Sequence, residues 1–306
     1  MITIITPTYN EEENIVDLYY AIKKEFKNLK YDYEHLVIDN SSSDKTVDLL
    51  RPLAKKDKKL KIIINARNFG HTKSPYYALT QTDSDAVILI AADFQDPPAL
   101  ITKFIRSWER GFKVALAVKE SSQENFIMFN IRKFFYSLIS KISDIELIKN
   151  ATGAGIYDRD VINVLKTLQE PNPYFRGLLC EIGYPIDKIT FKQPKRNKGI
   201  TKNNFYTLYD LALLGITNHS KVPIRVMSIV GFTLSILSIF VAIIFLILKV
   251  LFWDAFDLGT APIIIGIFFF GAIQTFCLGL IGEYIGSIHT NVRNFPLVVE
   301  KERINF

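Results

Sequence analysis

Two long apolar runs near the C-terminus constrain the fold of this chain more than any other feature. No charged residue occurs from Val226 to Leu248, and none occurs from Leu258 to Gly282. Because an α-helix rises about 1.5 Å per residue, each run is long enough to cross a hydrocarbon core about 30 Å thick. The runs therefore predict two transmembrane helices, at about 226–248 and 260–284, that form a hairpin. Buried helices of a soluble core are the alternative interpretation.

The charges around this hairpin predict its orientation. The segment between the runs, 249–257, carries Asp254 and Asp257, and the basic residues that flank the hairpin are Lys221, Arg225, Arg293, Lys301 and Arg303. Since lysine and arginine accumulate on the cytoplasmic side, both termini are expected in the cytoplasm. The first residues, Met1–Thr6, do not have the form of a signal peptide. We therefore expect a multi-pass protein of the inner (plasma) membrane with its N-terminal domain in the cytoplasm.

On this interpretation the chain has four parts: residues 1–200 form a cytoplasmic α/β domain, 201–224 a juxtamembrane interfacial helix, 225–286 the two membrane helices and 287–306 a cytoplasmic tail. The interfacial helix is predicted from apolar residues at helical spacing, among them Phe205, Leu208 and Tyr209. A core helix of the soluble domain is the alternative for that segment.

Residues 1–200 alternate between short β-branched runs and longer helical patterns. Strands are expected at Ile2–Thr6, His35–Ile38, Lys61–Ile64, Ala86–Ala91 and Lys113–Ala117, with helices that begin near Glu11, Ser43, Thr72 and Pro98. This rhythm is typical of βαβ units and predicts a mainly parallel sheet. Asn10 and Glu13 have the spacing of a capping-box variant for the first helix.

Polar residues follow several of the expected strands, where open α/β sheets bind ligands. Carboxylates gather there, in residues 7–11, 39–44 and 93–98. No G-x-G-x-x-G follows the first strand and no G-x-x-x-x-G-K-[ST] occurs, which argues against a dinucleotide dehydrogenase and a P-loop NTPase. Asp39 and Asp44 are each equally explained as turn or cap residues.

A metal site is predicted at the end of the fourth expected strand. Asp93 and Gln95 are two residues apart, so on an extended segment both side chains lie on one face and both offer oxygen. Mg²⁺ (or Mn²⁺) held by one or two such ligands, water and phosphate oxygens is the usual partner of a nucleotide diphosphate. Together the strand ends suggest a site for a divalent metal and a nucleotide.

The net charge of +6 and the pI near 9.0 fit nucleic acid, acidic lipid or a phosphorylated substrate equally well. Two cysteines, Cys180 and Cys277, are too few for a disulfide framework. With the carboxylates and the membrane hairpin, the basic charge is better explained by a phospholipid-like acceptor and by membrane lipid than by nucleic acid.

Seven motifs together resemble the family 2 glycosyltransferases of GT-A fold, and among them the polyprenyl-phosphate glycosyltransferases related to dolichyl-phosphate mannose synthase and to bacterial membrane-anchored glucosyltransferases. The resemblance extends over nearly the whole chain. The motifs are P-T-Y-N-E-E-E-N-I at 7–15, V-I-D-N-S-S-S-D-K-T at 37–46, R-N-F-G-H at 67–71, D-F-Q-D-P-P at 93–98, D-R at 158–159, Y-F-R-G at 174–177 and R-N-K-G-I-T-K at 196–202.

The resemblance implies a Rossmann-like, mainly parallel nucleotide-diphospho-sugar transferase domain followed by the membrane hairpin. It implies that the donor nucleotide is held by Pro7, Tyr9, Glu11, Asp39, Asn68 and Gly70. It implies that Asp93 and Gln95 bind the metal, with Asp93 and Asp158 as catalytic candidates. Candidates for the donor and acceptor phosphates are Lys119, Arg132, Arg196, Lys198 and Lys202, although the last three also fit a solvated basic loop beside an anionic membrane.

Two positions depart from the family's pattern. Relatives often read D-x-D at the metal segment, where this chain has Ala91, and many carry an aspartate proposed as the base where this chain has Gly153-Ala154-Gly155. A base is not required to activate the acceptor, because a phosphomonoester has a second pKa of about 6 and is largely dianionic at neutral pH. Glycine at 153 and 155 suggests the hypothesis that the donor pocket is enlarged for a sugar substituent such as an acetamido group.

The predicted function is inverting transfer of a sugar from a nucleotide donor, such as UDP-glucose or a UDP-N-acetylhexosamine, to undecaprenyl phosphate at the cytoplasmic membrane face. A processive polysaccharide synthase is one alternative, but no Q-x-x-R-W occurs. A catalytically silent, nucleotide-sugar-binding scaffold is the other, for which Ala91 and Gly153 argue.

Glycines and Gln274 in the second run suggest close helix contacts. Similar proteins form tetramers, so a homo-oligomer is expected by resemblance.

Overall fold

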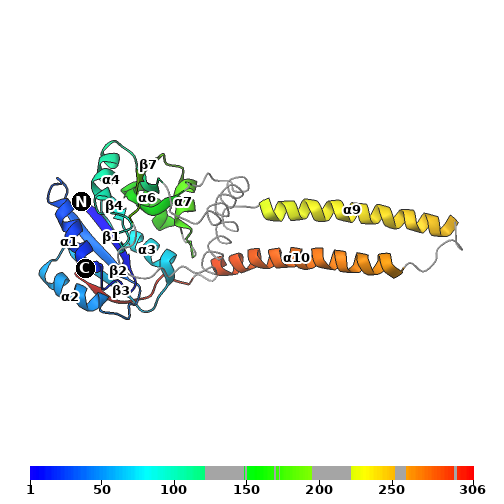
Figure 1. The fold of residues 1–306 in the computed structure, drawn as a ribbon, viewed down its shortest axis with the longest axis horizontal. Coiled ribbons are helices and arrows are strands. Elements are labelled where there is room, and N and C mark those ends of the chain that lie inside the picture. Colours follow the sequence, from blue (N-terminus) through cyan, green and yellow to red (C-terminus); the bar gives the residue numbers. More distant parts are fainter. Residues whose placement is uncertain are drawn as a thin grey trace.

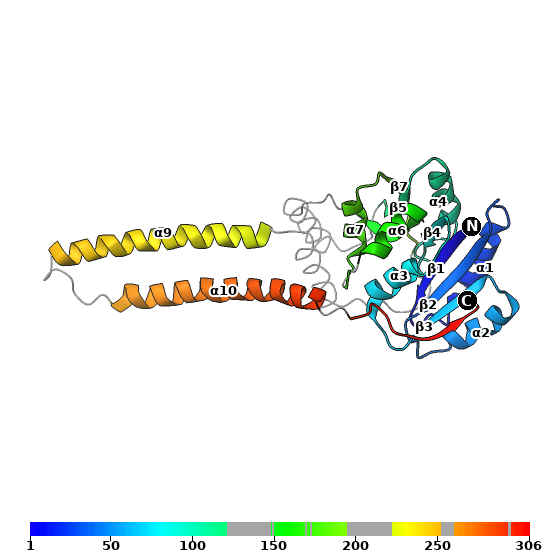
Figure 2. The same cartoon turned by 180° about the vertical axis from the view of Figure 1, so that it is seen from behind.

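The computed structural model describes residues 1–120, 148, 150–168, 170–171, 173–194, 222–251, 260–292 and 295–306. They form an α/β domain from which two long helices project (Figures 1 and 2). Both views place the N- and C-termini in the domain, on the side away from the two helices.

One sheet of eight strands runs through the domain in the order β7-β5-β6-β4-β1-β2-β3-β8. Pairing is parallel between β1 and its neighbours β2 and β4, between β2 and β3, and between β5 and β7. Within the described residues, β6 and β8 run against the other strands. The bounds are β1 Ile2–Thr8, β2 Tyr33–Asp39, β3 Leu60–Asn65, β4 Ala86–Leu89, β5 Val114–Lys119, β6 Ala151–Asp158, β7 Ile186–Phe191 and β8 Glu300–Ile304. The prediction of a mainly parallel sheet is confirmed.

Helices cover both faces of this sheet. One face packs against α1 (Ile15–Phe26), α2 (Thr46–Lys56) and α4 (Leu100–Glu109), and the other against α3 (Gly70–Thr80), α6 (Arg159–Thr167) and α7 (Phe175–Ile182). Successive strand side chains point to opposite faces, so Ile4 joins the core under α1 and Ile5 the core under α3. The buried strands read as nearly continuous apolar runs because both faces are covered.

The first helix begins later than its sequence predicts, and the capping-box prediction is wrong. Its N-cap is Asn14, without a side-chain cap hydrogen bond. Asn10 instead has a φ of 56°, in the left-handed region, and its Oδ1 accepts a hydrogen bond from the backbone N of Ser43 at 2.8 Å. Asn10 therefore joins two loops rather than capping α1.

The last residues of the chain are part of the domain rather than a tail. Strand β8 pairs antiparallel with β3 at the edge of the sheet, with Ile62 opposite Ile304 and Asn65 opposite Glu300. The Arg51 guanidinium on α2 donates to both carboxylate oxygens of Glu302, at 2.7 and 2.5 Å. The domain is thus built from two separate stretches of the sequence.

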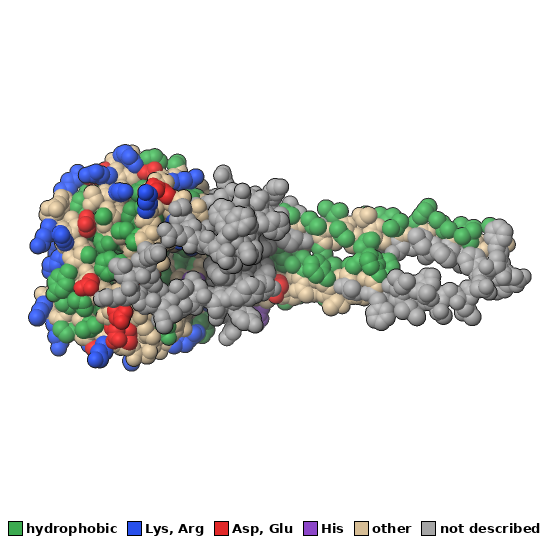
Figure 3. Space-filling view, in the orientation of Figure 1, with side chains coloured by type: hydrophobic (Ala, Val, Ile, Leu, Met, Phe, Trp, Pro, Cys, Tyr) green, Lys and Arg blue, Asp and Glu red, His purple; other side chains and the backbone are tan. Residues whose placement is uncertain are grey.

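The two projecting helices are α9 (Val222–Leu251), which contains the first apolar run, and α10 (Thr260–Val292), which covers most of the second run and continues past it through Glu283. They lie side by side in both views (Figures 1 and 2). Phe232 and Phe276 are 69% and 73% exposed, and the described side chains of both helices are mostly hydrophobic on the face shown in Figure 3. Among the described residues, the segment Phe269–His289 is long and apolar enough to cross a membrane.

Candidate active site

The candidate site lies along the edge of the sheet where the parallel strands end. Strand β6 runs the other way, so its first residues begin at this edge: Ala151 pairs with Val118 and Gly155 pairs with Leu89. Strand β8 also begins here, opposite Asn65, and follows α10 after a short connection. This edge of the domain therefore faces the projecting helices.

Hydrogen bonds between backbone and side chains join the loop after β1 to the loop after β2. The backbone N of Glu11 donates to Thr46 Oγ1 at 2.9 Å, and that of Glu12 donates to Asp44 Oδ2 at 3.1 Å. In return, the backbone N of Lys45 donates to Glu12 Oε2 at 2.9 Å. Asp44 Oδ1 also accepts from the backbone N of Thr46 at 2.9 Å, so Asp44 is a turn residue here.

Asp39, predicted to bind the nucleotide, is the last residue of β2 and has no exposed surface. Its carboxylate accepts hydrogen bonds from the backbone N and Oγ of Ser42, at 2.9 and 2.5 Å, and from Thr8 Oγ1 at 3.3 Å. Burial raises the pKa of this carboxyl, and the hydrogen bonds from Ser42 and Thr8 partly oppose that rise. Asp39 fixes the turn beside Pro7, which is itself a residue of β1 that lines a cavity.

A cluster of amides fixes the turn between β3 and α3. Asn40 Oδ1 accepts from Asn65 Nδ2 at 3.0 Å and from the backbone N of Phe69 at 2.9 Å, while Asn40 Nδ2 donates to Asn68 Oδ1 at 2.8 Å. Asn68 Oδ1 also accepts from the backbone N of Gly70 at 2.8 Å, and Gly70 has a φ of 91°. Two predicted nucleotide-binding residues, Asn68 and Gly70, are thus placed beside each other at the start of α3.

The predicted metal segment lines a cavity of about 250 Å³ at the end of β4. Asp93 Oδ1 accepts a hydrogen bond from the backbone N of Gln95 at 3.1 Å, and Phe94 between them has a φ of 57°. Lys119, the last residue of β5, lines the same cavity. The full lining is Ala91, Asp93, Gln95, Asp96, Lys119, Asn150, Ala151, Thr152, Arg176 and Gln193.

This donor set suits a hard cation. Asp93 and Gln95 both present oxygen, and Mg²⁺ keeps several waters and substrate phosphates beside one or two carboxylates. The described residues contain no group of three or more His, Cys, Asp or Glu side chains that could hold a metal on their own. A cation here would therefore depend on phosphate and water for the rest of its coordination.

A second cavity, of about 210 Å³, adjoins the first and is mostly apolar. The two share four lining residues: Ala91, Asp96, Thr152 and Arg176. The others that line the second cavity are Pro7, His71, Thr72, Pro75, Tyr76, Leu89, Gly153, Ala154, Tyr174 and Phe175. Residues from β1, α3, β4, β6 and α7 thus converge on one place.

Charged groups stand in the wall between the cavities. Burial raises the pKa of Asp96 to about 6, while a hydrogen bond from Thr152 and the positive charges of Lys119 and Arg176 oppose that rise. Burial also lowers the pKa of the His71 imidazole, and the nearby Arg176 guanidinium lowers it further. His71 is therefore neutral at physiological pH and can both donate and accept a hydrogen bond.

The two glycines of the proposed sugar pocket have different roles. Gly153 lines the second cavity with a φ of 96°, and a Cβ there would meet no atom within 4 Å. Gly155 lies between β4 and β5, where a Cβ would stand 2.4 Å from the backbone oxygen of Ala115. The enlargement hypothesis is wrong for Gly155, which is needed for close strand pairing, and it remains a prediction for Gly153.

Asp158 lies at the opposite edge of the sheet, where it pairs with Ala86 at the start of β4. Its carboxylate caps α6 by accepting from the backbone N of Asp160 at 3.0 Å and also accepts from Trp108 Nε1 at 2.8 Å. Asp158 is not brought together with the other candidates, and we leave it out of the site.

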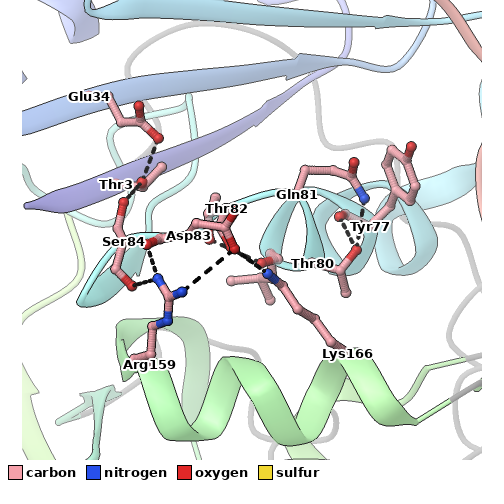
Figure 4. A network of polar contacts seen from close by, with 11 residues as sticks. Thr3, Glu34, Tyr77, Thr80, Gln81, Thr82, Asp83, Ser84, Arg159 and Lys166 are labelled. Carbon is pink, nitrogen blue, oxygen red and sulfur yellow. Dashed lines mark hydrogen bonds and ion pairs between the residues drawn. The ribbon is translucent and has the colours of Figure 1, made fainter. Parts of the chain in front are cut away.

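Its neighbour Arg159 binds the loop that enters β4 (Figure 4). The guanidinium donates to the backbone oxygen of Ser84 at 3.3 Å, and Lys166, two turns along the same helix, donates to that of Thr82 at 2.7 Å. The D-R pair therefore has a structural role in attaching α6 to the far edge of the sheet.

Four predicted phosphate-binding residues, Arg132, Arg196, Lys198 and Lys202, lie outside the described residues, as does most of the predicted juxtamembrane helix. Of the described candidates, Pro7, Asp93, Gln95 and Lys119 line the two cavities. Tyr9 and Glu11 lie in the loop after β1.

Sequence reasoning assigned no role to Asp96, Thr152 or Arg176, although Asp96 and Arg176 stand in quoted motifs. Asp96 follows Gln95 directly, which identifies it as a strand-end carboxylate, but its burial depends on β6 and α7. Arg176 reaches the site from the first turn of a helix that is distant in the sequence. Neither placement has a local sequence signal.

The family model described as "Glycosyl transferase family 2" matches residues 3–165. The chain is 33% identical to an uncharacterised glycosyltransferase of Synechocystis, over 97% of this chain and 93% of the relative. It is 32% identical to a prophage-derived bactoprenol glucosyl transferase of Shigella flexneri, over 98% of this chain and 97% of that protein. A prophage bactoprenol glucosyl transferase homologue of Escherichia coli is 30% identical, with 98% of each chain covered.

The fold is also similar to a solved structure, glucosyl-3-phosphoglycerate synthase from Mycobacterium tuberculosis in complex with Mn²⁺, uridine diphosphate and phosphoglyceric acid. The TM-score is 0.51 at 16% identity, and the match covers 71% of this chain and 76% of the other. At this identity the likeness concerns the fold alone, and it agrees with the α/β architecture of the domain.

Proposed function

This chain belongs to glycosyl transferase family 2 and to its polyprenyl-phosphate subgroup, and from that premise we propose that it transfers a sugar from a nucleotide diphosphate donor to polyprenyl phosphate at a membrane. The observation that carries the proposal is the pair of adjoining cavities at the carboxyl edge of the sheet. They combine a metal-type oxygen pair, Asp93 and Gln95, with two cations, Lys119 and Arg176.

The donor nucleotide is proposed to lie beside the ends of β1 and β2, held by Pro7, Tyr9 and Glu11, with Asn68 and Gly70 at the neighbouring turn. The buried Asp39 is proposed to act through the turn that it fixes. The hydrogen bonds between the loops after β1 and β2 support this assignment, because they fix that surface before any ligand binds. UDP is the expected nucleotide, and glucose or an N-acetylhexosamine the expected sugar.

Asp93 and Gln95 are proposed to hold Mg²⁺ or Mn²⁺. When bound, such a cation neutralises charge on the diphosphate leaving group. The fold neighbour was crystallised with Mn²⁺ and uridine diphosphate, and the oxygen donors of this chain are of the type that such cations prefer. Ala91, where relatives often carry aspartate, leaves this chain with a single carboxylate in the D-x-D positions.

The chemistry we propose is a single inverting displacement: the acceptor phosphate oxygen attacks the anomeric carbon as the bond from that carbon to the diphosphate oxygen breaks and the nucleoside diphosphate leaves. The phosphate is largely dianionic at neutral pH and needs no base. Lys119 and Arg176 stand where they can bind phosphate oxygens and stabilise negative charge in a partly enclosed site. The chain thus binds and orients two anionic substrates against each other.

We propose a membrane hairpin of two spans with the domain in the cytoplasm; the path of the chain supports the hairpin, and the flanking basic residues support the orientation. Strand β7 precedes α9, and β8 follows α10, yet both strands belong to one sheet. The domain lies on one side of any membrane, so the chain between these strands must cross an even number of times. If α10 crosses, as its apolar segment allows, a second crossing is required, and we assign it to α9. Oligomerisation through these helices stays a proposal by resemblance.

The direct test is transfer by the full-length protein in detergent or nanodiscs. With Mg²⁺, a nucleotide sugar and undecaprenyl phosphate, we expect one equivalent of UDP released for each lipid-linked sugar, identified by mass spectrometry. A scaffold would release no UDP, and a processive synthase would lengthen a glycan. Failure to form a lipid product from every nucleotide sugar tried would refute the proposal.

A further inference from the structure

Asp96 is a buried carboxylate whose hydrogen bonding is incomplete. Its exposed fraction is 5%. Its Oδ1 atom is buried and has no hydrogen-bond partner among the residues that the structure describes. A buried polar atom without a partner costs free energy, and native proteins rarely leave one in that state unless a ligand completes it.

The position of Asp96 indicates where that ligand lies. Asp96 lines both cavities, so it stands in the wall between the metal-type pair, Asp93 and Gln95, and the smaller apolar cavity. Arg176 and Thr152 line both cavities as well, and Lys119 lines the larger one. Thr152 donates a hydrogen bond to the Asp96 carboxylate, and Oδ1 is the oxygen that has no partner among the described residues.

The chemistry of a carboxylate narrows the choice of ligand group. A carboxylate oxygen is completed by a hydrogen-bond donor or by a cation, whereas a phosphate oxygen would be repelled. Asp96 also lines the mostly apolar cavity, whose described lining residues include no second acidic side chain for a cation, so a neutral donor is the better match there. The smaller cavity, at about 210 Å³, lies below the range of roughly 300–1,000 Å³ that is usual for drug-sized ligands, so it suits one ring rather than a whole nucleotide sugar. A sugar ring offers several hydroxyl donors and an apolar face, which matches this lining.

We propose that Asp96 binds the transferred sugar by accepting a hydrogen bond from one of its hydroxyl groups, and that the apolar cavity is the sugar subsite. The inference rests on the proposed function, because it takes the ligand to be a nucleotide sugar. Asp96 is a specificity-determining residue on this assignment: a sugar without that hydroxyl leaves the buried carboxylate unsatisfied and binds more weakly.

Binding and transfer by the Asp96→Asn variant test the assignment. The asparagine keeps the volume of the side chain and removes its charge. Because UDP lacks the sugar, we expect its affinity in the presence of Mg²⁺ to change by less than about twofold, whereas the affinity for UDP-sugar should fall about 5- to 10-fold, because the sugar hydroxyl then donates to a neutral amide in place of a charged acceptor. Calorimetry without acceptor measures both affinities.

A series of monodeoxy UDP-sugars identifies the hydroxyl. Relative to the parent UDP-sugar, the wild-type protein should bind one analogue more weakly by a factor similar to the effect of Asp96→Asn. The Asp96→Asn variant should bind that same analogue almost as well as it binds the parent UDP-sugar. For the other analogues, the loss from the missing hydroxyl and the loss from Asp96→Asn should add. Additive losses for every analogue would overturn the proposal. So would an equal loss of UDP and UDP-sugar affinity, which would indicate that Asp96 acts on the metal or the diphosphate.

The control variant is Asp83→Asn, which makes the same chemical change. Asp83 precedes β4, whereas Asp96 follows it, and the Asp83 side chain is 82% exposed. The control variant should bind both ligands as the wild type does. If Asp96→Asn does not fold, as judged by its melting temperature, the deoxy series on the wild-type protein still decides: equal affinity for all analogues would overturn the assignment. Failure of the proposed function is distinguishable, since binding is measured without transfer.

Discussion

At the scale of single residues, the candidate site contains three aspartates that all stand near strand ends in the sequence but differ in burial and in hydrogen-bond partners. Asp39 is buried and satisfied by its own turn, while Asp96 is buried with an oxygen left over. Asp93 is only partly buried and faces a polar cavity. Each aspartate stands at or after the end of a strand, but neighbouring elements decide which one fixes the backbone, which one is proposed to bind sugar and which one is proposed to hold a cation.

Replacing Asp93 should impair transfer through the metal. In Asp93→Asn, the carboxylate of the proposed ligand pair is lost, and we expect kcat/KM to fall at least about 100-fold, since metal stabilisation of a leaving group contributes several kcal/mol. The Mg²⁺ concentration for half-maximal UDP release should also rise. Asp48→Asn on the exposed surface of α2 is the matched control. An unchanged Mg²⁺ requirement in Asp93→Asn would contradict the ligand role.

A side chain at position 153 should narrow the range of donors. Gly153→Asp places a carboxyl toward the smaller cavity, where a Cβ meets no other atom, although the φ of 96° adds some backbone strain. We expect sugars with an acetamido substituent to be disfavoured relative to unsubstituted hexoses. Transfer rates from a panel of UDP-sugars check this expectation, and an unchanged donor preference would count against it.

His35 should make the domain less stable as the pH falls. It is 1% exposed, its Nε2 lies 3.0 Å from Thr6 Oγ1, and burial lowers its pKa to about 4 from 6.5. Between these values the unfolded chain binds a proton that the folded chain does not, so stability is retained above pH 6.5 and decreases toward pH 4, by up to about 3 kcal/mol.

The role of His35 is tested by the melting temperature of the detergent-solubilised protein at pH values from about 7.5 to about 5, the range in which an ordinary histidine titrates. The same curve is measured for His35→Gln. The variant has no titrating imidazole, so its melting temperature should decline less steeply with acid. Parallel curves for the two proteins would show that another group is responsible.

At the scale of elements, the parts of the fold with a clear local pattern are predictable. The five predicted strands all occur, because β-branched apolar runs between polar turns signal a buried parallel sheet. Strands β6, β7 and β8 were not predicted. Strand β6 contains two glycines, and β8 reads E-K-E-R-I, which lacks an apolar face. Its charged side chains are stabilised by partners such as Arg51 and Tyr77, which are distant in sequence.

Any side chain at Gly155 should destabilise the domain, because β5 and β6 pair closely at that position. In Gly155→Ala the new Cβ would stand 2.4 Å from the Ala115 backbone oxygen and 2.9 Å from Leu116 Cδ2, so the strands must separate. We expect a loss of about 1–3 kcal/mol, the usual cost of overpacking, seen as a lower melting temperature. Gly231→Ala in α9, where a Cβ meets nothing within 4 Å, is the control and should leave the domain's melting unchanged.

At the scale of the whole molecule, the sheet and the helices are linked in a way that sets the geometry of the reaction. The carboxyl edge of the sheet carries the cavities and also receives the chain as it returns from α10 to β8. On the proposed function, a lipid phosphate at the membrane surface would therefore meet the edge of the sheet that carries the two cavities. The apolar surface of α9 and α10 and the charged surface of the domain suit two different solvents (Figure 3).

The proposed hairpin predicts which segments an impermeant reagent can reach. After Cys180 and Cys277 are replaced by serine, a cysteine introduced in place of Asp254, in the connection between the helices, should react from outside intact cells. A cysteine introduced in place of Asp83 in the domain should react only after the cells are opened. Equal reactivity of both positions in intact cells would contradict the hairpin.

The sequence by itself determined the mainly parallel sheet, the two apolar helices, the family and the strand-end motifs, because each of these depends on residues that are neighbours in the chain or repeat at a fixed period. Only the tertiary structure decided that the C-terminal segment completes the sheet, that Asp158 lies at the far edge, that Gly155 serves strand pairing, and that Asp96 and Arg176 share the wall of two cavities. These facts depend on strand order, direction and register, which bring together side chains whose sequence separation carries no local signal.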